Sequence, residues 1–218
     1  MIARVAEAED YTQITDLVSR AFKQPRLELN IVSFTINHDP NFQKGDLRVV
    51  EDNSRIVSVM MVIRRQLRVG TALVNGAIVA PVATHPEYQG KGYCSVLMRD
   101  AIRYMKAQDL DLSLLWGIPW LYPHYGYSSS MSRTHAFIIP EESKPVEGDL
   151  GRFRPLEESD LKQITSIYHA NTSQRTCAEV RLPERWAWES GGSSVDFQVL
   201  EDRKGNVTGY CVFGKDWG

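Results

Sequence analysis

The chain has 218 residues, of which 43% are apolar and 24% are charged, and its formal net charge is −2. These values are typical of a globular protein and exclude a disordered tail, a fibre or a small disulfide scaffold. The balance of charge provides no global attraction to nucleic acid or to an anionic membrane.

The first predicted elements are a short strand, a helix and a β-hairpin. Asp10 and Gln13 have the spacing of a helix start, in which both side chains cap backbone amides. One face of this helix is apolar: Ile14, Leu17, Val18, Ala21 and Phe22. Strands over 47–50 and 56–63 flank a turn at 51–55. Residues 66–69 extend the hairpin or form another strand. We expect these nearby arginines on a solvated face: Arg64, Arg65 and Arg68.

A second set of elements follows the hairpin. A strand over 73–84 ends at His85-Pro86, because proline cannot donate to a sheet ladder. A helix over 93–108, an apolar strand over 110–116 and a short helix or turn over 119–124 come next, and a strand over 134–139 closes the series. The order predicts a mixed α/β protein, α+β-like because a hairpin precedes the strand–loop–helix.

An internal repeat divides the chain. Residues 4–15 and 154–165 are identical at six of twelve positions, and 47–52 matches 197–202 at the same offset of 150. The pattern predicts a complete module over 1–145 and the opening half of a second copy over 150–218. Half a module leaves apolar side chains in need of cover from elsewhere; we expect this of Tyr210, Val212 and Phe213.

The loop between the fourth strand and the next helix carries two glycines, Gly90 and Gly92. Such a loop presents unpaired amides and the positive end of a helix dipole, which bind phosphates. A simple glycine turn is an equally good reading of the glycines alone. Two other phosphate loops are excluded, because His85 stands where a Walker loop needs its first glycine and Ser95 where a dinucleotide fingerprint needs its third.

The loop and a later aromatic segment resemble one family. Gln89-x-x-Gly92-x-Cys94 is similar to the Arg/Gln-x-x-Gly-x-Gly/Ala acetyl-CoA loop of the GNAT acyltransferase superfamily. Residues 121–127, Leu-Tyr-Pro-His-Tyr-Gly-Tyr, resemble the segment with its catalytic tyrosine. The second module makes the chain most similar to the enhanced-intracellular-survival (Eis-like) acetyltransferases. This resemblance implies a GNAT fold, a central mixed sheet flanked by helices, followed by the opening half of a second GNAT-like module.

The resemblance also implies a site for acetyl-CoA as co-substrate. The loop amides would cradle the pyrophosphate, the edge of the strand before them would pair with pantetheine, and the tip of the next strand would flank the thioester. Tyr122 would protonate the departing thiolate, since the ordinary pKa values of a thiol and a tyrosine are close. The implied binding residues are Val82, Ala83, Thr84, Gln89, Gly90, Lys91, Gly92, Tyr93, Cys94, Ser95, Gly117 and Ile118.

The expected function is N-acetyl transfer to a primary amine of a small molecule or peptide, by direct attack in a ternary complex. A variable loop, 22–42, would line the amine pocket. The alternative is a non-catalytic GNAT-fold module that binds CoA or a partner. Eis-like proteins carry a further C-terminal domain whose terminal carboxylate is thought to act as base, and this chain ends without it.

Individual side chains have structural alternatives. Tyr122 could be a core aromatic, and Cys94 is read as a small loop residue rather than a nucleophile. Trp186 and Trp188 are expected to pack in a core. The histidines have no metal-ligand spacing, so no metal is expected.

The surroundings of the protein are also predicted. Three widely spaced cysteines indicate reduced thiols in the cytoplasm. Acidic residues near the N-terminus argue against a signal peptide, and the longest apolar runs are too short to span a bilayer. We expect no nucleic-acid or membrane partner, and a homo-oligomer stays open.

Overall fold

The computed structural model describes residues 1–129, 151–186 and 195–214. The predicted strand over 134–139 and Trp188 lie outside these ranges. The chain forms two compact units: residues 1–126 with 174–180, and residues 127–173 with 181–218. The module boundaries expected from the repeat, 1–145 and 150–218, stay a prediction.

The first unit is built on a five-stranded sheet in the order β1-β2-β3-β4-β5. Neighbouring strands are antiparallel except β4 and β5, which are parallel. This mixed sheet with flanking helices confirms the predicted fold class. The strands are β1 (Ala3–Val5), β2 (Leu47–Asp52), β3 (Arg55–Val69), β4 (Ala72–Thr84) and β5 (Leu112–Leu114).

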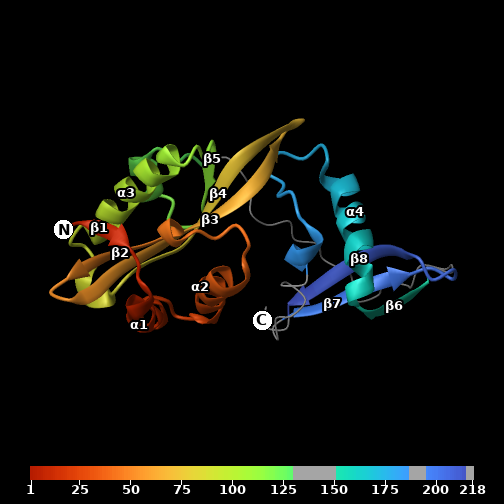
Figure 1. The fold of residues 1–218 in the computed structure, drawn as a ribbon, viewed down its shortest axis with the longest axis horizontal. Helices are drawn as coiled ribbons and strands as arrows, with labels where there is room; N and C mark the ends of the chain where they lie inside the picture. The colour runs from red at the N-terminus through yellow and green to blue at the C-terminus, as the bar shows by residue number, and fades with distance from the viewer. Residues whose placement is uncertain (130–150, 187–194, 215–218) are drawn as a thin grey trace. The chain divides into compact units, whose positions relative to one another are not determined.

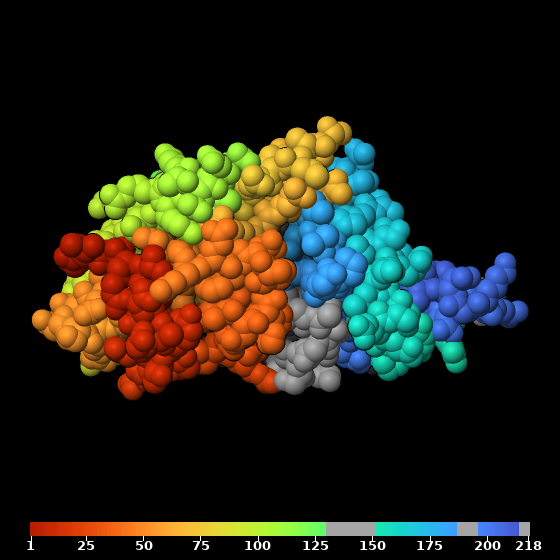
Figure 2. All heavy atoms as spheres, in the orientation of Figure 1, coloured from red at the N-terminus to blue at the C-terminus, as the bar shows by residue number. Residues whose placement is uncertain are grey.

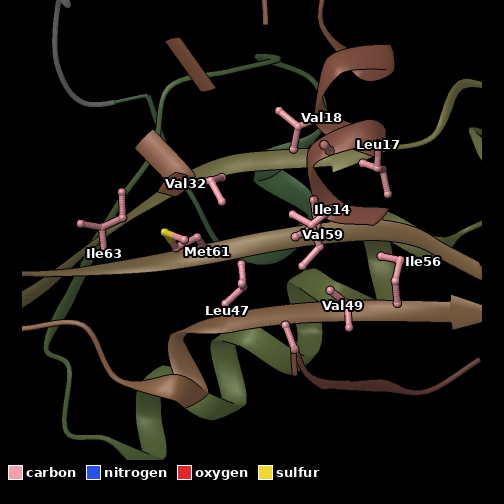
Figure 3. Close-up of a cluster of buried hydrophobic side chains, with 12 residues drawn as sticks. Ile14, Leu17, Val18, Val32, Leu47, Val49, Ile56, Val59, Met61 and Ile63 are labelled. Atoms are coloured by element: carbon pink, nitrogen blue, oxygen red, sulfur yellow. The ribbon is translucent and has the colours of Figure 1, made fainter. Parts of the chain in front are cut away.

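Helices cover both faces of this sheet. α1 (Tyr11–Ala21) and α2 (Arg26–His38) lie on one face and α3 (Tyr93–Ala107) on the other (Figure 1). Figure 3 shows Ile14, Leu17 and Val18 of α1 beside strand residues that include Val59. Each fully buried aliphatic side chain stabilises the fold by about 1.5–3 kcal/mol. The outer surfaces of α1 and α2 face solvent (Figure 2).

The start of α1 differs from the prediction. Asp10 does accept a capping hydrogen bond, but from the N–H of Glu7 (2.8 Å), in the short 3-10 turn before the helix. The Gln13 side chain instead accepts from the N–H of Ile56 in β3 (3.0 Å). Gln13 therefore joins α1 to the sheet and does not cap the helix.

α2 occupies most of the segment that was expected to be a loop. Leu29 and Ile36 pack against the core cluster, and Val32 is 7% exposed within it. Their spacing of three and four residues places them on one helical face. The prediction of a loop over 22–42 was wrong, since most of this segment is α2. The apolar spacing already indicated a helix.

The three arginines expected on a solvated face are not fully exposed: Arg65 is buried, and Arg64 and Arg68 are half-buried. Arg65 is 6% exposed. Its guanidinium pairs with Asp39 at the end of α2 (2.6 Å) and with Glu179 (2.9 Å). Arg64 pairs with the buried Asp46 (3.0 Å). The prediction failed because these acids are distant in the sequence.

Glu179 belongs to a segment, 174–180, that lies alongside β3. The N–H of Arg68 donates to the Ala178 carbonyl (2.9 Å), and the Cys177 N–H donates to the Arg68 carbonyl (2.6 Å). The N–H of Val180 donates to the Gln66 carbonyl (2.8 Å). This segment pairs the edge of β3 beyond the reach of β2.

The second unit repeats the opening of the first. Its strands β6 (Arg152–Pro155), β7 (Val195–Glu201) and β8 (Val207–Gly214) form an antiparallel sheet, with α4 (Leu161–Thr172) between the first two in sequence. Arg4 pairs with Val49, and Arg154 pairs with Val199, at the offset of 150. The β7–β8 turn has one extra residue, since Val199 faces Tyr210 where Val49 faces Val59, so the offset becomes 151 in β8.

A three-residue ion cluster also occurs in both units. Arg4 pairs with Asp10 (2.6 Å) and with Glu51 (2.7 Å), which joins β1, the start of α1 and β2. The hydrogen bond from Arg4 lowers the pKa of Asp10. The corresponding residues of the second unit, with ion pairs of 2.6 Å each, are Arg154, Asp160 and Glu201.

The second unit has its own apolar core. Trp186 is 1% exposed, as expected of a packing residue, and its ring meets Tyr210 at 5.3 Å. Tyr210 also stacks on Phe197 (5.7 Å). Cover for Tyr210 thus comes from its own unit, contrary to expectation, whereas Val212 and Phe213 are 44% and 55% exposed.

Candidate active site

The loop after β4 presents backbone amides to open space. Gly90 and Gly92 have φ values of +74° and +88°, which glycine adopts at little cost. Apart from the adjacent residues of the chain, no atom of the described residues lies within 4 Å of where a side chain at either glycine would begin. Gly92 is the N-cap of α3, and Val96 N–H donates to the Gly92 carbonyl (3.1 Å). The amides before Val96 therefore have no acceptor within the helix, and the helix start is a place where an anion could bind.

Side chains of the loop hold it in place. The Tyr93 hydroxyl donates to Asp52 (2.6 Å), which raises the pKa of Tyr93. Gln89 donates to the Thr84 carbonyl (3.3 Å). His85 is 4% exposed and lies 2.8 Å from an Arg55 nitrogen. The loop is thus tied to the β2–β3 hairpin and to the end of β4.

The edge of β4 beside this loop has an open side. β4 pairs with β5 only from Gly76 to Ile78. Val82, Ala83 and Thr84 pair with β3 on one side, and among the described residues no strand pairs with their other side. A register shift in the β3–β4 ladder precedes this stretch. An extended, peptide-like ligand could pair with such an edge.

Tyr122 begins a 3-10 turn, η4 (Tyr122–Tyr125), and is 9% exposed. Its ring lies against the backbone of Gly117: a Cβ there would be 2.4 Å from the ring carbon Cε2 and 3.0 Å from the hydroxyl oxygen. Ile118 is 43% exposed. The hydroxyls of Ser95 and Tyr125 are 2.7 Å apart. The first turn of α3 and η4 are therefore in direct contact.

Cys94 is half-buried in the first turn of α3. Burial raises the pKa of its thiol. A protonated thiol is a poor nucleophile, so its environment favours the reading as a small loop residue.

Two polar side chains of α2 were missed by sequence reasoning. Thr35 is 2% exposed, and its hydroxyl has no hydrogen-bond partner within the described ranges. The buried Oε2 atom of Glu28, seven residues earlier, also has no hydrogen-bond partner within these ranges. Glu28, Val32 and Thr35 are spaced by four and three residues, which places them on one face of α2. The helical spacing was the signal, and it was overlooked with the helix.

The described residues contain neither a cluster of metal ligands nor a helix that could span a membrane. No His, Cys, Asp and Glu side chains there form a group of three or more that could hold a metal ion. No helix in those ranges is long and apolar enough to cross a bilayer.

Comparisons with known proteins identify the family of the chain. The family model of the acetyltransferase (GNAT) domain matches residues 3–130. The chain therefore belongs to the GNAT acetyltransferase family, whose members use an acyl-CoA co-substrate. A search of curated protein sequences finds no significant match.

Three solved structures share the fold. A probable N-acyltransferase from Enterococcus faecalis has a TM-score of 0.75 at 19% identity, over 96% of this chain and 54% of that one. A GCN5-related N-acetyltransferase from Anabaena variabilis has a TM-score of 0.73 at 16% identity, over 97% of this chain and 53% of that one. An N-myristoyltransferase from Saccharomyces cerevisiae with bound myristoyl-CoA has a TM-score of 0.66 at 13% identity, over 97% of this chain and 56% of that one. The chain spans about half the length of these structures.

Proposed function

We propose that this protein is an Eis-like N-acetyltransferase that moves the acetyl group of acetyl-CoA to a primary amine of a small molecule or peptide. One observation carries the proposal. The anion-binding amides at the start of α3 adjoin an open β4 edge, and η4, which contains Tyr122, contacts the same helical turn. The free cysteines of the described chain favour a cytoplasmic setting.

Each part of the site has a role in this proposal. The amides from Gly90 to Ser95 bind the pyrophosphate, and the free edge at 82–84 pairs with the pantetheine amides. Gly117 and Ile118 flank the thioester.

The chemical step is direct transfer. The amine nitrogen attacks the carbonyl carbon, a C–N bond forms and the C–S bond breaks. Tyr122 gives its proton to the departing thiolate, and the amine proton leaves to solvent or to a base. The tyrosine then regains a proton from solvent, so the step is balanced.

The test measures free thiol released from acetyl-CoA with a panel of amines. We expect Tyr122→Phe to lower turnover by about 10²–10⁴-fold, the usual contribution of a general acid, while the Kd for CoA stays unchanged. Tyr11→Phe, on α1, is the matched control and should keep full turnover. If chemistry is rate-limiting and Tyr122→Phe keeps the wild-type turnover, then another group is the general acid. CoA binding without thiol release from any amine would favour the non-catalytic alternative.

A further inference from the structure

A pocket of about 430 Å³ lies beside the candidate site, on the side of α3 that faces η4. Arg99, Ile102 and Arg103 of α3 line it, together with His124 and Tyr125 of η4. All five belong to the first unit. No role in the proposed acetyl transfer uses the two arginines.

The pocket is rich in positive charge that is not neutralised. Within the described part of the chain, Arg99 forms no ion pair, and Arg103 is near only Asp100, at 3.8 Å. Asp100 itself is engaged by Arg48. None of the lining residues is acidic. Arginine presents a fork of N–H donors that matches a phosphate group, and Tyr125 can add a hydroxyl.

The position of the pocket relative to the loop selects the ligand. Ser95 belongs to the anion-binding turn, and Arg99 follows it by one helical turn, about 5.4 Å along the axis. Ser95 also contacts Tyr125 of the pocket wall (2.7 Å). An anion here is thus one helical turn from the proposed pyrophosphate. In CoA a single ribose separates the pyrophosphate from a second phosphate, the 3′-phosphate.

We propose that this pocket binds the 3′-phosphate of CoA, through Arg99 and Arg103. The inference rests on the proposed function, because it takes the loop to hold the pyrophosphate. It makes the pocket a determinant of specificity: the protein distinguishes CoA from dephospho-CoA, which lacks only this phosphate. The same two arginines could instead bind free inorganic phosphate, which presents the same kind of group.

The experiment compares the Kd of the full chain for CoA, dephospho-CoA and inorganic phosphate. We expect wild type to bind CoA about tenfold or more tightly than dephospho-CoA. Arg99→Gln/Arg103→Gln should bind both at the dephospho-CoA level. Both arginines are exposed, so the variant should fold. Lys106→Gln, on the same helix and outside the pocket, should preserve the wild-type preference.

Three outcomes would overturn the inference. Equal affinity of wild type for CoA and dephospho-CoA would do so and leave the proposed function intact. A preference that persists in the double arginine variant would also do so. Inorganic phosphate that binds equally well with and without saturating CoA, and only when both arginines are present, would assign the pocket to free phosphate. Failure of wild type to bind either nucleotide would instead contradict the proposed function.

Discussion

Gly92 tests whether the loop holds an anion. Gly92→Asp should abolish CoA binding, because its carboxylate would stand among the amides that receive the pyrophosphate. The φ of +88° makes any side chain strained here, so Gly92→Asn is the matched control: it carries the same strain without the charge, and asparagine tolerates this conformation. We expect Asn to keep measurable CoA affinity by calorimetry. If folded Gly92→Asp binds as tightly as Gly92→Asn, the loop is not the phosphate site.

Gly117 tests the placement of Tyr122. Gly117→Ala would put a Cβ 2.4 Å from the Tyr122 ring, so the ring must move. We expect turnover to fall and CoA affinity to change little, because a displaced Tyr122 hydroxyl could no longer protonate the leaving thiolate. In the double variant Gly117→Ala/Tyr122→Phe, the losses should not add. Additive losses in kcat would show that the glycine acts independently of the tyrosine.

At the residue scale, the sequence predicts what depends on neighbours in the chain. The glycines of the loop and the aromatic segment around Tyr122 were identified because each motif is local. The roles of Gln13 and Arg65 were not, because their partners Ile56 and Glu179 lie 43 and 114 positions away. Spacing alone does not encode such partners.

At the element scale, the repeated ion clusters make matched predictions. Asp10→Asn and Asp160→Asn should each lower the free energy of unfolding at neutral pH, because each removes an ion pair to an arginine. In both native units the hydrogen bond from arginine lowers the pKa of the aspartate. The stabilisation is therefore complete above the ordinary aspartate pKa, about 3.9, and is lost as the pH falls through the lower native value.

Chemical denaturation at several pH values measures this effect. The difference between wild type and each variant should shrink on acidification. Asp16→Asn is the control, since Asp16 forms an exposed pair with Arg20 and such pairs contribute little. A difference that is constant from neutral to strongly acidic pH would mean that the charge of the aspartate is not what stabilises the cluster.

Most elements were predictable from the sequence because their periodicity is strong. The hairpin, β4, α3 and the opening of the second unit all follow the predicted order. α2 was not predicted, because the family resemblance implied a variable loop over 22–42. β5 spans only Leu112–Leu114, shorter than its apolar run, since β4 pairs with it over three residues.

At the scale of the whole molecule, we predict one CoA per chain. The described second unit contains β6, α4, β7 and β8, and the phosphate loop of the first unit follows β4, which has no equivalent in those ranges. Titration calorimetry on the full chain should give a stoichiometry of one. Two CoA molecules per chain would contradict the assignment of a single site.

A core variant separates the two units. Trp186→Ala should destabilise the second unit by about 3–5 kcal/mol, because its side chain is fully buried. The proposed CoA site lies in the first unit and should keep its affinity. Loss of CoA binding with the first unit still folded would show that the site needs the second.

The segment 174–180 also determines when the edge of β3 gains its partner during translation. Its contacts with β3 join residues as far apart as Gln66 and Val180, a separation of 114. A ribosome needs roughly 5–20 s to add that many residues. For that time the outer edge of β3 near Gln66 and Arg68 is synthesised without its partner, and unpaired edges attract other strands. The first unit is therefore completed only when the segment 174–180 has left the ribosome.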